Sequence, residues 1–307
     1  MIIDYLDRVY YRLSKKRGRF FSLIRFIYRT SSSFFLEWYF ILFPSRVKSL
    51  PPKEGEKALI VSLTSFPLRI GKIWMVVECI LRQKMLPNKI VLTLSKSQFP
   101  NDLRDLPTRL VRFAEKRILT IEFVEEDLRS HKKYYYTFQK YKNDIVVLLD
   151  DDIIYPSTLL SDLYSYHIKN PDCIIAHRCY DVSKETGSKI SPYKKWNYSR
   201  DYGVPLGKLF HTSGAGTLYV PRWFDSELFN EDVFKELCMY ADDVWLNIHA
   251  QRNSIKTVKT SYNSLLLPVL RYKDIKLKSF NREGEGNDLQ LKNLVDYYGL
   301  EDQKLFN

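Results

Sequence analysis

The stretch IVVLLDDD at residues 145–152 decides how the rest of the chain is interpreted. Five consecutive apolar residues are typical of a strand that is buried on both faces of a sheet. The aspartates Asp150, Asp151 and Asp152 follow these residues directly. Because side chains alternate along a strand, Asp150 and Asp152 should lie on one side and Asp151 on the other. The stretch therefore predicts a buried strand that ends in a cluster of carboxylates.

Similar apolar runs precede this strand at regular intervals. They begin near residues 58, 89 and 119, and the segments between them are long enough to contain crossover helices. Such spacing is typical of successive βα units. We therefore expect an α/β fold, with a mostly parallel sheet and helices on both faces. In sheets of this kind ligands bind beyond the carboxyl ends of the strands, which is where the three aspartates lie.

The aspartate cluster itself points to a metal. Three neighbouring carboxylates repel one another, and burying them is costly unless a cation neutralises them. Hard oxygen ligands suit Mg²⁺ or Mn²⁺, with water and a diphosphate completing the coordination. Helix capping is the alternative, because Ser157 stands where a helix should begin, but capping needs one such residue and not three. We expect Asp150 and Asp152 to bind Mn²⁺ or Mg²⁺.

Other motifs and the composition disfavour several function classes. The chain has no GxxxxGK[ST] loop, and Gly214 and Gly216 lead into a strand, the wrong context for a dinucleotide fingerprint. The four cysteines form no CxxC pair, so neither a zinc ribbon nor a disulfide scaffold is expected. The formal net charge is +12, but residues 1–50 carry +7 of it. Since the excess is local, we expect no nucleic-acid partner.

Residues 1–50 form a basic, aromatic segment that is joined to the rest by a proline-rich linker at 51–57. Ile2, Leu6 and other apolar residues recur at helical spacing, and an aromatic run follows at 34–43. Ten residues that include Glu37 are too few to span a bilayer, which needs about 20 apolar residues. The pattern predicts an interfacial anchor on an anionic membrane surface. The alternative is that the segment packs on the main domain or forms a dimer contact.

Five motifs follow one another along the main part of the chain: SLTSFPLRI (62–70), HKKY (131–134), the aspartates at 150–152, TSGAGTLYVP (212–221) and ADDVWL (241–246). In this order they resemble the motifs of a bacterial family of surface-polysaccharide glycosyltransferases. Enzymes of that family have the GT-A fold and a DXD motif, and are similar to glycosyltransferase family 2. The resemblance covers about residues 57–300. It implies a GT-A domain at 58–300, with a nucleotide-binding half at 58–156 and an acceptor half at 157–300.

The resemblance also implies roles for individual residues on the donor side. The end of the first strand would hold the base and ribose of a nucleoside-diphosphate sugar, and Lys132 and Lys133 would meet its diphosphate. Asp151 would lie near the ribose or act as a second metal ligand. Glycines at 214 and 216 would let the backbone approach the sugar or acceptor closely. The residues expected to bind the donor are Thr64, Phe66, Pro67, Arg69, Lys132, Lys133, Asp150, Asp151, Gly214 and Gly216.

Two acidic residues, Asp242 and Asp243, precede a further helical stretch in the acceptor half. One aspartate at such a place is usually an N-cap, so the second is left to act as a base on an acceptor hydroxyl. We expect Asp243 to be that base and Asp242 to be a cap or an acceptor ligand. A direct displacement of this kind would invert the configuration of the transferred sugar, although the sequence leaves a retaining course open.

Taken together, these features predict a metal-dependent glycosyltransferase that moves a sugar to a hydroxyl of a glycan or lipid-linked acceptor. It would work in the cytoplasm, at the inner face of the cell membrane. One alternative is nucleotidyl or phosphoryl transfer, which uses the same acidic metal site but usually a glycine-rich phosphate loop. Another is a non-catalytic protein that binds membranes or nucleic acid, which would leave the acids at a buried strand end unexplained.

Overall fold

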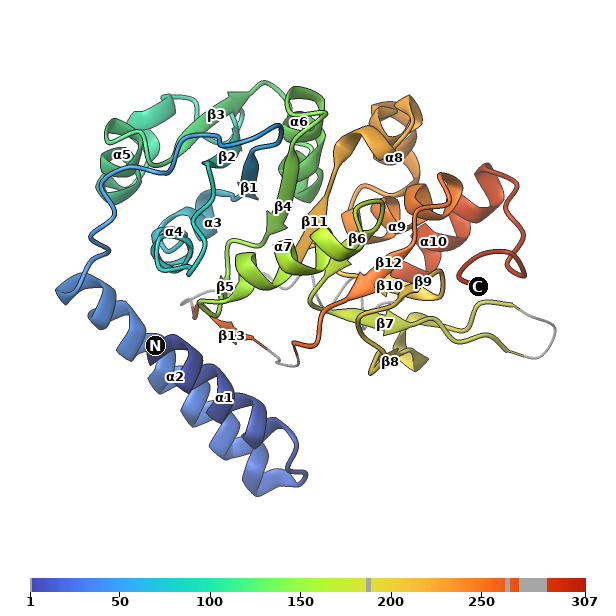
Figure 1. Cartoon of the computed structure of the whole chain (residues 1–307), viewed down its shortest axis with the longest axis horizontal. Coiled ribbons are helices and arrows are strands. Elements are labelled where there is room, and N and C mark those ends of the chain that lie inside the picture. The colour runs from blue at the N-terminus through green and yellow to red at the C-terminus, as the bar shows by residue number, and fades with distance from the viewer. Residues whose placement is uncertain (1, 186–188, 263–265, 271–285) are drawn as a thin grey trace.

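The computed structural model describes residues 2–185, 189–262, 266–270 and 286–307. Figure 1 shows a main body built around a twisted sheet, with two N-terminal helices extending along one side of it. The α-helices are α1 (Ile2–Ser14), α2 (Arg19–Leu42), α3 (Pro67–Ile70), α4 (Trp74–Ile80), α5 (Thr108–Glu115), α6 (Lys132–Lys140), α7 (Leu159–Lys169), α8 (Glu231–Leu237), α9 (Asp242–Arg252) and α10 (Gly286–Tyr297). The strands are β1 (Leu59–Thr64), β2 (Lys89–Ser95), β3 (Thr120–Val124), β4 (Ile145–Leu149), β5 (Ile153–Ile154), β6 (Ile174–Ala176), β7 (Cys179–Asp181), β8 (Asn197–Tyr198), β9 (Pro205–Leu206), β10 (Leu209–His211), β11 (Ala215–Tyr219), β12 (Thr257–Lys259) and β13 (Leu267–Pro268).

The central sheet has eight strands in the order β3-β2-β1-β4-β11-β6-β12-β9. Strands β1 to β4 are the four apolar runs of the sequence, and they pair in parallel. β11 and β9 run against the other six strands, which all point the same way. The predicted fold class, α/β with a mostly parallel sheet and helices on both faces, is confirmed. The division of the main domain at residue 156 stays a prediction.

Alternate residues of the buried strands serve two separate cores, as expected for a strand covered on both faces. On one face Leu59 and Val147 pack with α4, α7 and the N-terminal helices. On the other face Ile60 and Val146 pack with α6, α8, α9 and α10. Because both faces are covered, polar ligands can approach the central strands only at their ends.

The reversed strand β11 lies between β4 and β6 and carries an irregularity at Gly216. The register with β4 shifts between Ala215 and Thr217, which marks a β-bulge. Gly216 has a φ of 101°, a conformation that side chains disfavour. A Cβ on Gly216 would also lie 2.6 Å from Leu159 Cδ1. Backbone conformation and packing against α7 are therefore sufficient to explain this glycine, and its contact with a donor stays a prediction.

The N-terminal helices α1 and α2 pack against each other and against the main domain. Ile3, Leu36 and Phe40 are fully buried in the same core as β1 and β4. The Asp4 carboxylate accepts hydrogen bonds from the backbone N–H of Ser157 at 2.7 Å and from its hydroxyl at 2.8 Å. Packing on the main domain is therefore part of what this segment does. Among the described helices, none is both long and apolar enough to cross a membrane.

Ser157 does not cap α7, contrary to the capping alternative considered from the sequence. The N-cap position of α7 belongs to Thr158, whose side chain makes no capping hydrogen bond. Ser157 instead holds α1 through Asp4, as described above. This bond links the first turn of the chain to the residues that follow the aspartate cluster.

Candidate active site

A cavity of about 430 Å³ lies at the carboxyl ends of β1 and β4. Eight of the residues expected to bind a donor line this one cavity: Thr64, Phe66, Pro67, Arg69, Lys132, Lys133, Asp150 and Asp151. They come from the end of β1, the start of α6 and the end of β4, segments far apart in the sequence. Parallel pairing brings these strand ends to one edge of the sheet.

Arg69 and Ser65 hold the middle aspartate in place. The Asp151 carboxylate accepts from the Ser65 hydroxyl at 2.6 Å and from Arg69 Nη1 at 2.9 Å. The same Arg69 nitrogen lies 3.0 Å from Asp152 Oδ2. The Asp151 side chain is only 5% exposed, whereas those of Asp150 and Asp152 are 37% and 31% exposed. Asp151 is thus the most buried of the three aspartates. Residues 151 and 152 form a turn beyond the end of β4, so strand alternation does not govern their side chains, and Arg69 contacts Asp151 and Asp152 together.

The ammonium of Lys133 joins the aspartate cluster to a second acidic group. Lys133 Nζ lies 3.0 Å from Asp150 Oδ1 and 2.9 Å from Asp242 Oδ2. Its side chain is only 4% exposed. Burial alone would lower the pKa of Lys133, but the charges of Asp150 and Asp242 outweigh burial and raise it. Lys133 is therefore a permanent cation between the end of β4 and the start of α9.

These contacts change the electrostatic argument made from the sequence. Repulsion among the three aspartates is relieved by Arg69 and Lys133, which are part of the protein. A bound metal is thus not needed to neutralise the cluster, and the metal expectation must depend on the accessibility and chemistry of Asp150 and Asp152.

Lys132, the other lysine of the HKKY motif, is engaged by a different acid. Its buried ammonium forms an ion pair with Asp127 at the rim of the cavity. Burial lowers the pKa of Lys132, although Asp127 works in the opposite direction. Contact between Lys132 and a diphosphate stays a prediction.

The two acids at the start of α9 differ in their surroundings. Asp243 Oδ1 accepts from both the backbone N–H of Ser213 at 2.8 Å and its hydroxyl at 2.6 Å. Burial raises the pKa of Asp243 to about 6, and the neighbouring Asp242 carboxylate adds to this effect. Burial works the same way on Asp242, but Lys133 and His131 outweigh it, so the pKa of Asp242 is lowered. This pair therefore combines a permanent anion with a carboxylate that can exchange a proton near neutral pH.

Neither acid caps α9. The N-cap position is occupied by Ala241, and no side-chain capping bond is formed there. The expectation that Asp242 is a cap is wrong, because its carboxylate points to Lys133 instead. Its other expected role, as an acceptor ligand, stays a prediction.

Gly214 touches the aspartate cluster directly. A Cβ on Gly214 would lie 1.7 Å from Asp150 Oδ2, so any other residue would displace this carboxylate. The hydroxyl of Tyr155 accepts from the Asp150 N–H at 2.8 Å and donates to the Gly214 carbonyl. Tyr155 thus fixes the end of β4 against the start of β11. The site needs glycine at position 214 to leave room for Asp150.

Sequence reasoning assigned no role to Ser65, Tyr155, Ser213 or Arg178. The two serines lie within the quoted motifs, and their hydroxyls donate to Asp151 and Asp243, two aspartates that the sequence analysis singled out. Their position next to predicted site residues in those motifs could have identified both serines as candidates. Arg178 follows the short strand β6, and its guanidinium donates to the Thr212 hydroxyl at 2.7 Å. Nothing in the sequence pattern distinguishes Arg178 from other arginines.

The donor atoms of Asp150 and Asp152 fit a hard divalent cation. Both carboxylates are accessible, and oxygen ligands of this kind are those that Mg²⁺ and Mn²⁺ prefer. Within the described parts of the chain, no group of three His, Cys, Asp or Glu side chains is arranged to hold a metal. The two aspartates therefore suit a cation that takes its remaining ligands from water and a bound diphosphate.

No family model matches the chain, and no curated protein matches it. Solved structures do show similarity. A mannosyltransferase from Pyrobaculum calidifontis, in complex with GDP-Man and Mn²⁺, has 12% identity and a TM-score of 0.45, covering 95% of this chain and 76% of its own.

Two synthases are also similar. 4-Diphosphocytidyl-2C-methyl-D-erythritol synthase has 11% identity and a TM-score of 0.41, covering 74% of this chain and 99% of its own. CMP:2-keto-3-deoxy-manno-octonic acid synthetase, complexed with CTP, has 13% identity and a TM-score of 0.42, covering 76% of this chain and 99% of its own. Similarity at this level does not bear on the reaction.

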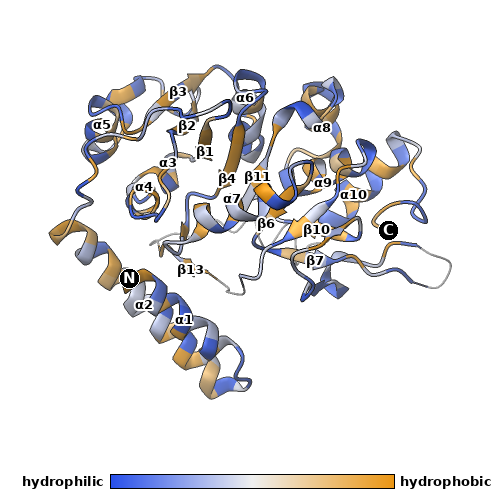
Figure 2. Cartoon of the chain, viewed as in Figure 1, coloured by the Kyte–Doolittle hydropathy of each residue, from blue (hydrophilic) through white to orange (hydrophobic). Residues whose placement is uncertain are grey.

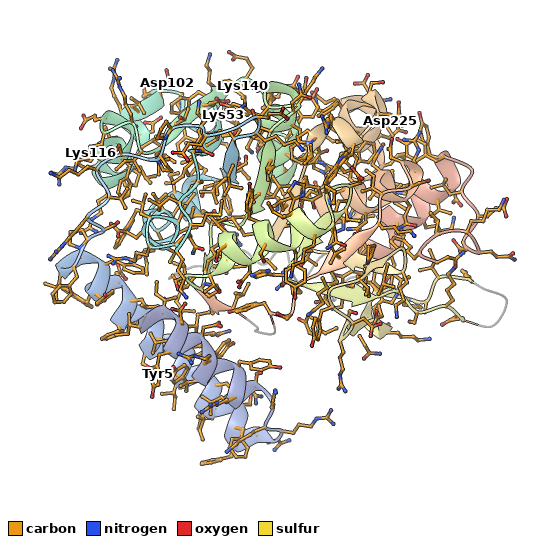
Figure 3. All side chains as sticks on the ribbon, viewed as in Figure 1. Tyr5, Lys53, Asp102, Lys116, Lys140 and Asp225 are labelled. Carbon is orange, nitrogen blue, oxygen red and sulfur yellow. The ribbon has the colours of Figure 1, made fainter. Side chains whose placement is uncertain are left out.

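Replacing Lys133 by Met should destabilise the fold. The apolar stem is kept, but Asp150 and Asp242 lose the ammonium between them. We expect the free energy of unfolding to fall by about 3 kcal/mol, the order of the cost of removing one partner from a buried ion pair. Lys140→Met is the matched control, because this exposed lysine binds Glu122 at the surface, and it should cost less than about 1 kcal/mol. Chemical denaturation measures both variants (Lys140 is labelled in Figure 3). Equal losses would contradict the central position of Lys133.

Proposed function

We propose that the protein is a metal-dependent glycosyltransferase that moves a sugar from a nucleoside-diphosphate sugar to a hydroxyl of a glycan or lipid-linked acceptor. The observation that carries the proposal is the single cavity at the ends of β1 and β4. It gathers eight residues expected to bind the donor, and Lys133 connects it to the acid pair of α9. A donor site and a carboxylate that titrates near neutral pH thus share one edge of the sheet.

The donor would occupy the 430 Å³ cavity. Phe66 and Pro67 give its wall apolar surface for the base. The Thr64 hydroxyl donates to the Thr93 carbonyl at 2.8 Å, so it would meet the donor as an acceptor. Arg69 and Lys133 supply fixed positive charge close to the aspartates. Such an arrangement of cations and accessible carboxylates suits a metal-bound diphosphate.

Asp150 and Asp152 would hold Mn²⁺ or Mg²⁺. When bound, such an ion stabilises the negative charge that develops on the departing nucleoside diphosphate. The protein contributes the geometry: Arg69 orients Asp152, and Lys133 orients Asp150. Gly214 leaves the room that the Asp150 carboxylate occupies.

Asp243 would act as the general base. In this scheme its carboxylate takes the proton of the acceptor hydroxyl, while the hydroxyl oxygen forms a bond to the anomeric carbon of the donor sugar. The bond from that carbon to the diphosphate breaks, and its electron pair leaves with the nucleoside diphosphate. Ser213 holds Asp243 in place through two hydrogen bonds. One displacement of this kind inverts the anomeric configuration.

Nucleotidyl transfer is a second candidate, favoured by the cations around the cavity. Arg69, Arg129, Lys132 and Lys133 all line it, and a nucleoside triphosphate would also suit such surroundings. The two reactions differ in their products, because glycosyl transfer releases a nucleoside diphosphate and nucleotidyl transfer releases inorganic diphosphate.

Product analysis separates the two candidates. With Mn²⁺ and a panel of labelled nucleotide sugars, the wild-type protein should release a nucleoside diphosphate, directly or by slow hydrolysis. The variant Asp150→Asn with Asp152→Asn should lose this activity by at least 100-fold, since both expected metal ligands are gone. Asp102→Asn with Asp225→Asn is the matched control, because both acids are exposed and neither lines the cavity. Both are labelled in Figure 3. Full activity of the first variant would refute the metal assignment, and release of inorganic diphosphate from triphosphates would favour the second candidate.

The base assignment predicts how the rate depends on pH. Asp243 must be ionised to accept a proton, and its pKa lies at about 6. The value of kcat/KM should therefore rise with pH through about 6, from about a tenth of its maximum at pH 5 to about nine-tenths at pH 7. Asp243→Asn should lower kcat by at least 100-fold and remove this rise. A wild-type profile that stays flat between pH 5 and 7 would contradict the assignment.

We further propose that the outer face of α2 contacts an anionic membrane surface. Successive residues of an α-helix are rotated by about 100°, so residues three or four apart lie on the same side. One side of α2 carries an exposed apolar stripe, which consists of Phe20, Leu23, Ile27, Phe34, Trp38, Ile41 and Leu42. The opposite side carries Leu36 and Phe40 and packs on the main domain. Figure 2 shows hydrophobic residues along the length of α2.

Charge beside this stripe supports the same contact. The turn between α1 and α2 holds Lys15, Lys16 and Arg17, all exposed. Tyr5 lies on the exposed side of α1 and adds a further aromatic ring (Figure 3). An apolar stripe with flanking basic residues is the arrangement by which a helix lies in the plane of an anionic interface.

Point substitutions test this contact better than truncation, because the helices also contribute to the core. The variant Phe34→Ser with Trp38→Ser should bind vesicles of mixed anionic and neutral phospholipid at least tenfold more weakly, since two apolar side chains no longer insert. Tyr202→Ser with Tyr297→Ser, which removes two exposed aromatic rings elsewhere, should bind as the wild type does. Co-sedimentation measures the binding. Equal loss in both variants, or none in either, would refute the proposed face.

A further inference from the structure

A second, larger cleft of about 690 Å³ lies at the same sheet edge as the donor cavity. Its floor consists of the residues that follow β6 and β12, namely His177, Arg178 and Tyr262. Strands β4, β6 and β12 run in the same direction, so their carboxyl ends form one edge. The end of the α1 helix and the α1–α2 turn provide the opposite wall, through residues such as Arg17. The N-terminal helices and the main domain thus build this cleft together.

The cleft is strongly positive. Five cationic side chains line it, against two acidic ones, Asp181 and Asp201. Both acids are already paired with Lys208, which is not part of the lining. The five cations are Lys15, Arg17, Arg178, Arg200 and Lys259. They give the cleft a net charge of +3 even before the pairing of its acids is considered.

Polar atoms in the wall of the cleft also lack partners. His177 is 3% exposed; its Nδ1 shares a hydrogen bond with the Thr260 hydroxyl at 2.9 Å, but its Nε2 has none among the described residues. The hydroxyl of Ser199, also 3% exposed, has no partner among those residues either. Buried polar atoms are seldom left unpaired in native proteins. Both atoms belong to residues that line this basic cleft, so a polar ligand bound there is a candidate partner for them.

Arg178 connects the cleft to the proposed active site. Its guanidinium donates to Thr212, the residue that precedes Ser213, which binds Asp243. Burial works to lower the pKa of Arg178, but it is raised by Tyr180 and Tyr198 and, to a smaller extent, by Asp243 and Asp150. Arg178 therefore lies between the cleft and the residues that hold the proposed base.

We propose that this cleft binds the phosphate or diphosphate group of the acceptor, so that the neighbouring sugar hydroxyl reaches Asp243. The inference rests on the proposed function, because it names the class of acceptor for that site. A diphosphate diester carries about two negative charges at neutral pH, which matches a net charge of +3 better than a single carboxylate does. Arginine and lysine are also the residues that recognise phosphate oxygens most effectively.

The cleft's position explains why the acceptor should carry phosphate close to a membrane. Lys15 and Arg17 belong to the turn of the helical pair whose outer face carries the apolar stripe. A phosphate held between this turn and Arg200 would lie beside the helical pair whose outer face we propose to contact lipid. An acceptor with a lipid chain, a diphosphate and a sugar would thus be aligned with membrane, cleft and base in that order.

Equilibrium binding in EDTA, without donor, tests the cleft independently of any transfer. The probes are geranyl diphosphate and inorganic diphosphate, and calorimetry measures the affinity of the protein for each of them. Arg17→Gln with Arg200→Gln should bind geranyl diphosphate at least tenfold more weakly than the wild type, because two exposed cations of the cleft are removed. Arg12→Gln with Lys16→Gln is the matched control: it removes the same charge from exposed positions outside the cleft and should stay within twofold. The variant Arg129→Gln, in the donor cavity, should also stay within twofold.

If the cleft variant binds both probes more weakly, the cleft is a site for the diphosphate alone. If it binds only geranyl diphosphate more weakly, the cleft is a site for a lipid-linked group. Equal affinity of the two double variants would overturn the proposal. So would a loss that follows Arg129→Gln, or a wild-type protein that binds neither probe at millimolar concentration. Because no transfer is measured, a protein that fails the transferase assay could still show or refute this binding.

Discussion

The buried ammonium of Lys133 is the interaction on which the site depends. It binds Asp150, at the end of a central strand, and Asp242, at the start of α9, with nearly equal distances of 3.0 and 2.9 Å. Carboxylates this close together would otherwise repel each other in a medium of low polarity. With Lys133 between them, the end of β4 and the start of α9 can face one another. Arg69 does the same for Asp151 and Asp152 on the other side of the cluster.

The sheet explains why these groups meet. Both of its faces are covered, so the carboxyl ends of its parallel strands are where polar groups can gather. The reversed strand β11 brings Gly214 and Ser213 to the same edge from the opposite direction. The cavity at the ends of β1 and β4, where we propose that the donor binds, lies on one side of β11 and the basic cleft on the other. The acid pair of α9 lies between them. This order suits a reaction in which donor and acceptor approach from two sides.

Much of this could be predicted from the sequence, because its strongest signals are local. Continuous apolar runs identified β1 to β4, and the three aspartates stand directly after β4. The partners of those aspartates could not be predicted, since Arg69 and Asp151 are 82 residues apart and their contact depends on strand pairing. Periodicity found helices in residues 1–50 but could not show which side of α2 is buried. Arg178 and the basic cleft arise only when β6, β12 and the N-terminal helices come together.

The most direct test of the account is the melting temperature of the protein with a panel of nucleoside diphosphates and nucleotide sugars, each with and without Mn²⁺. Ligands that bind the native state raise its stability by mass action. We predict a rise that requires both Mn²⁺ and one nucleotide base in the wild type, and that disappears in the variant Asp150→Asn with Asp152→Asn. A rise that persists in this variant, or no rise with any nucleotide, would contradict a metal-assisted nucleotide site at the end of β4.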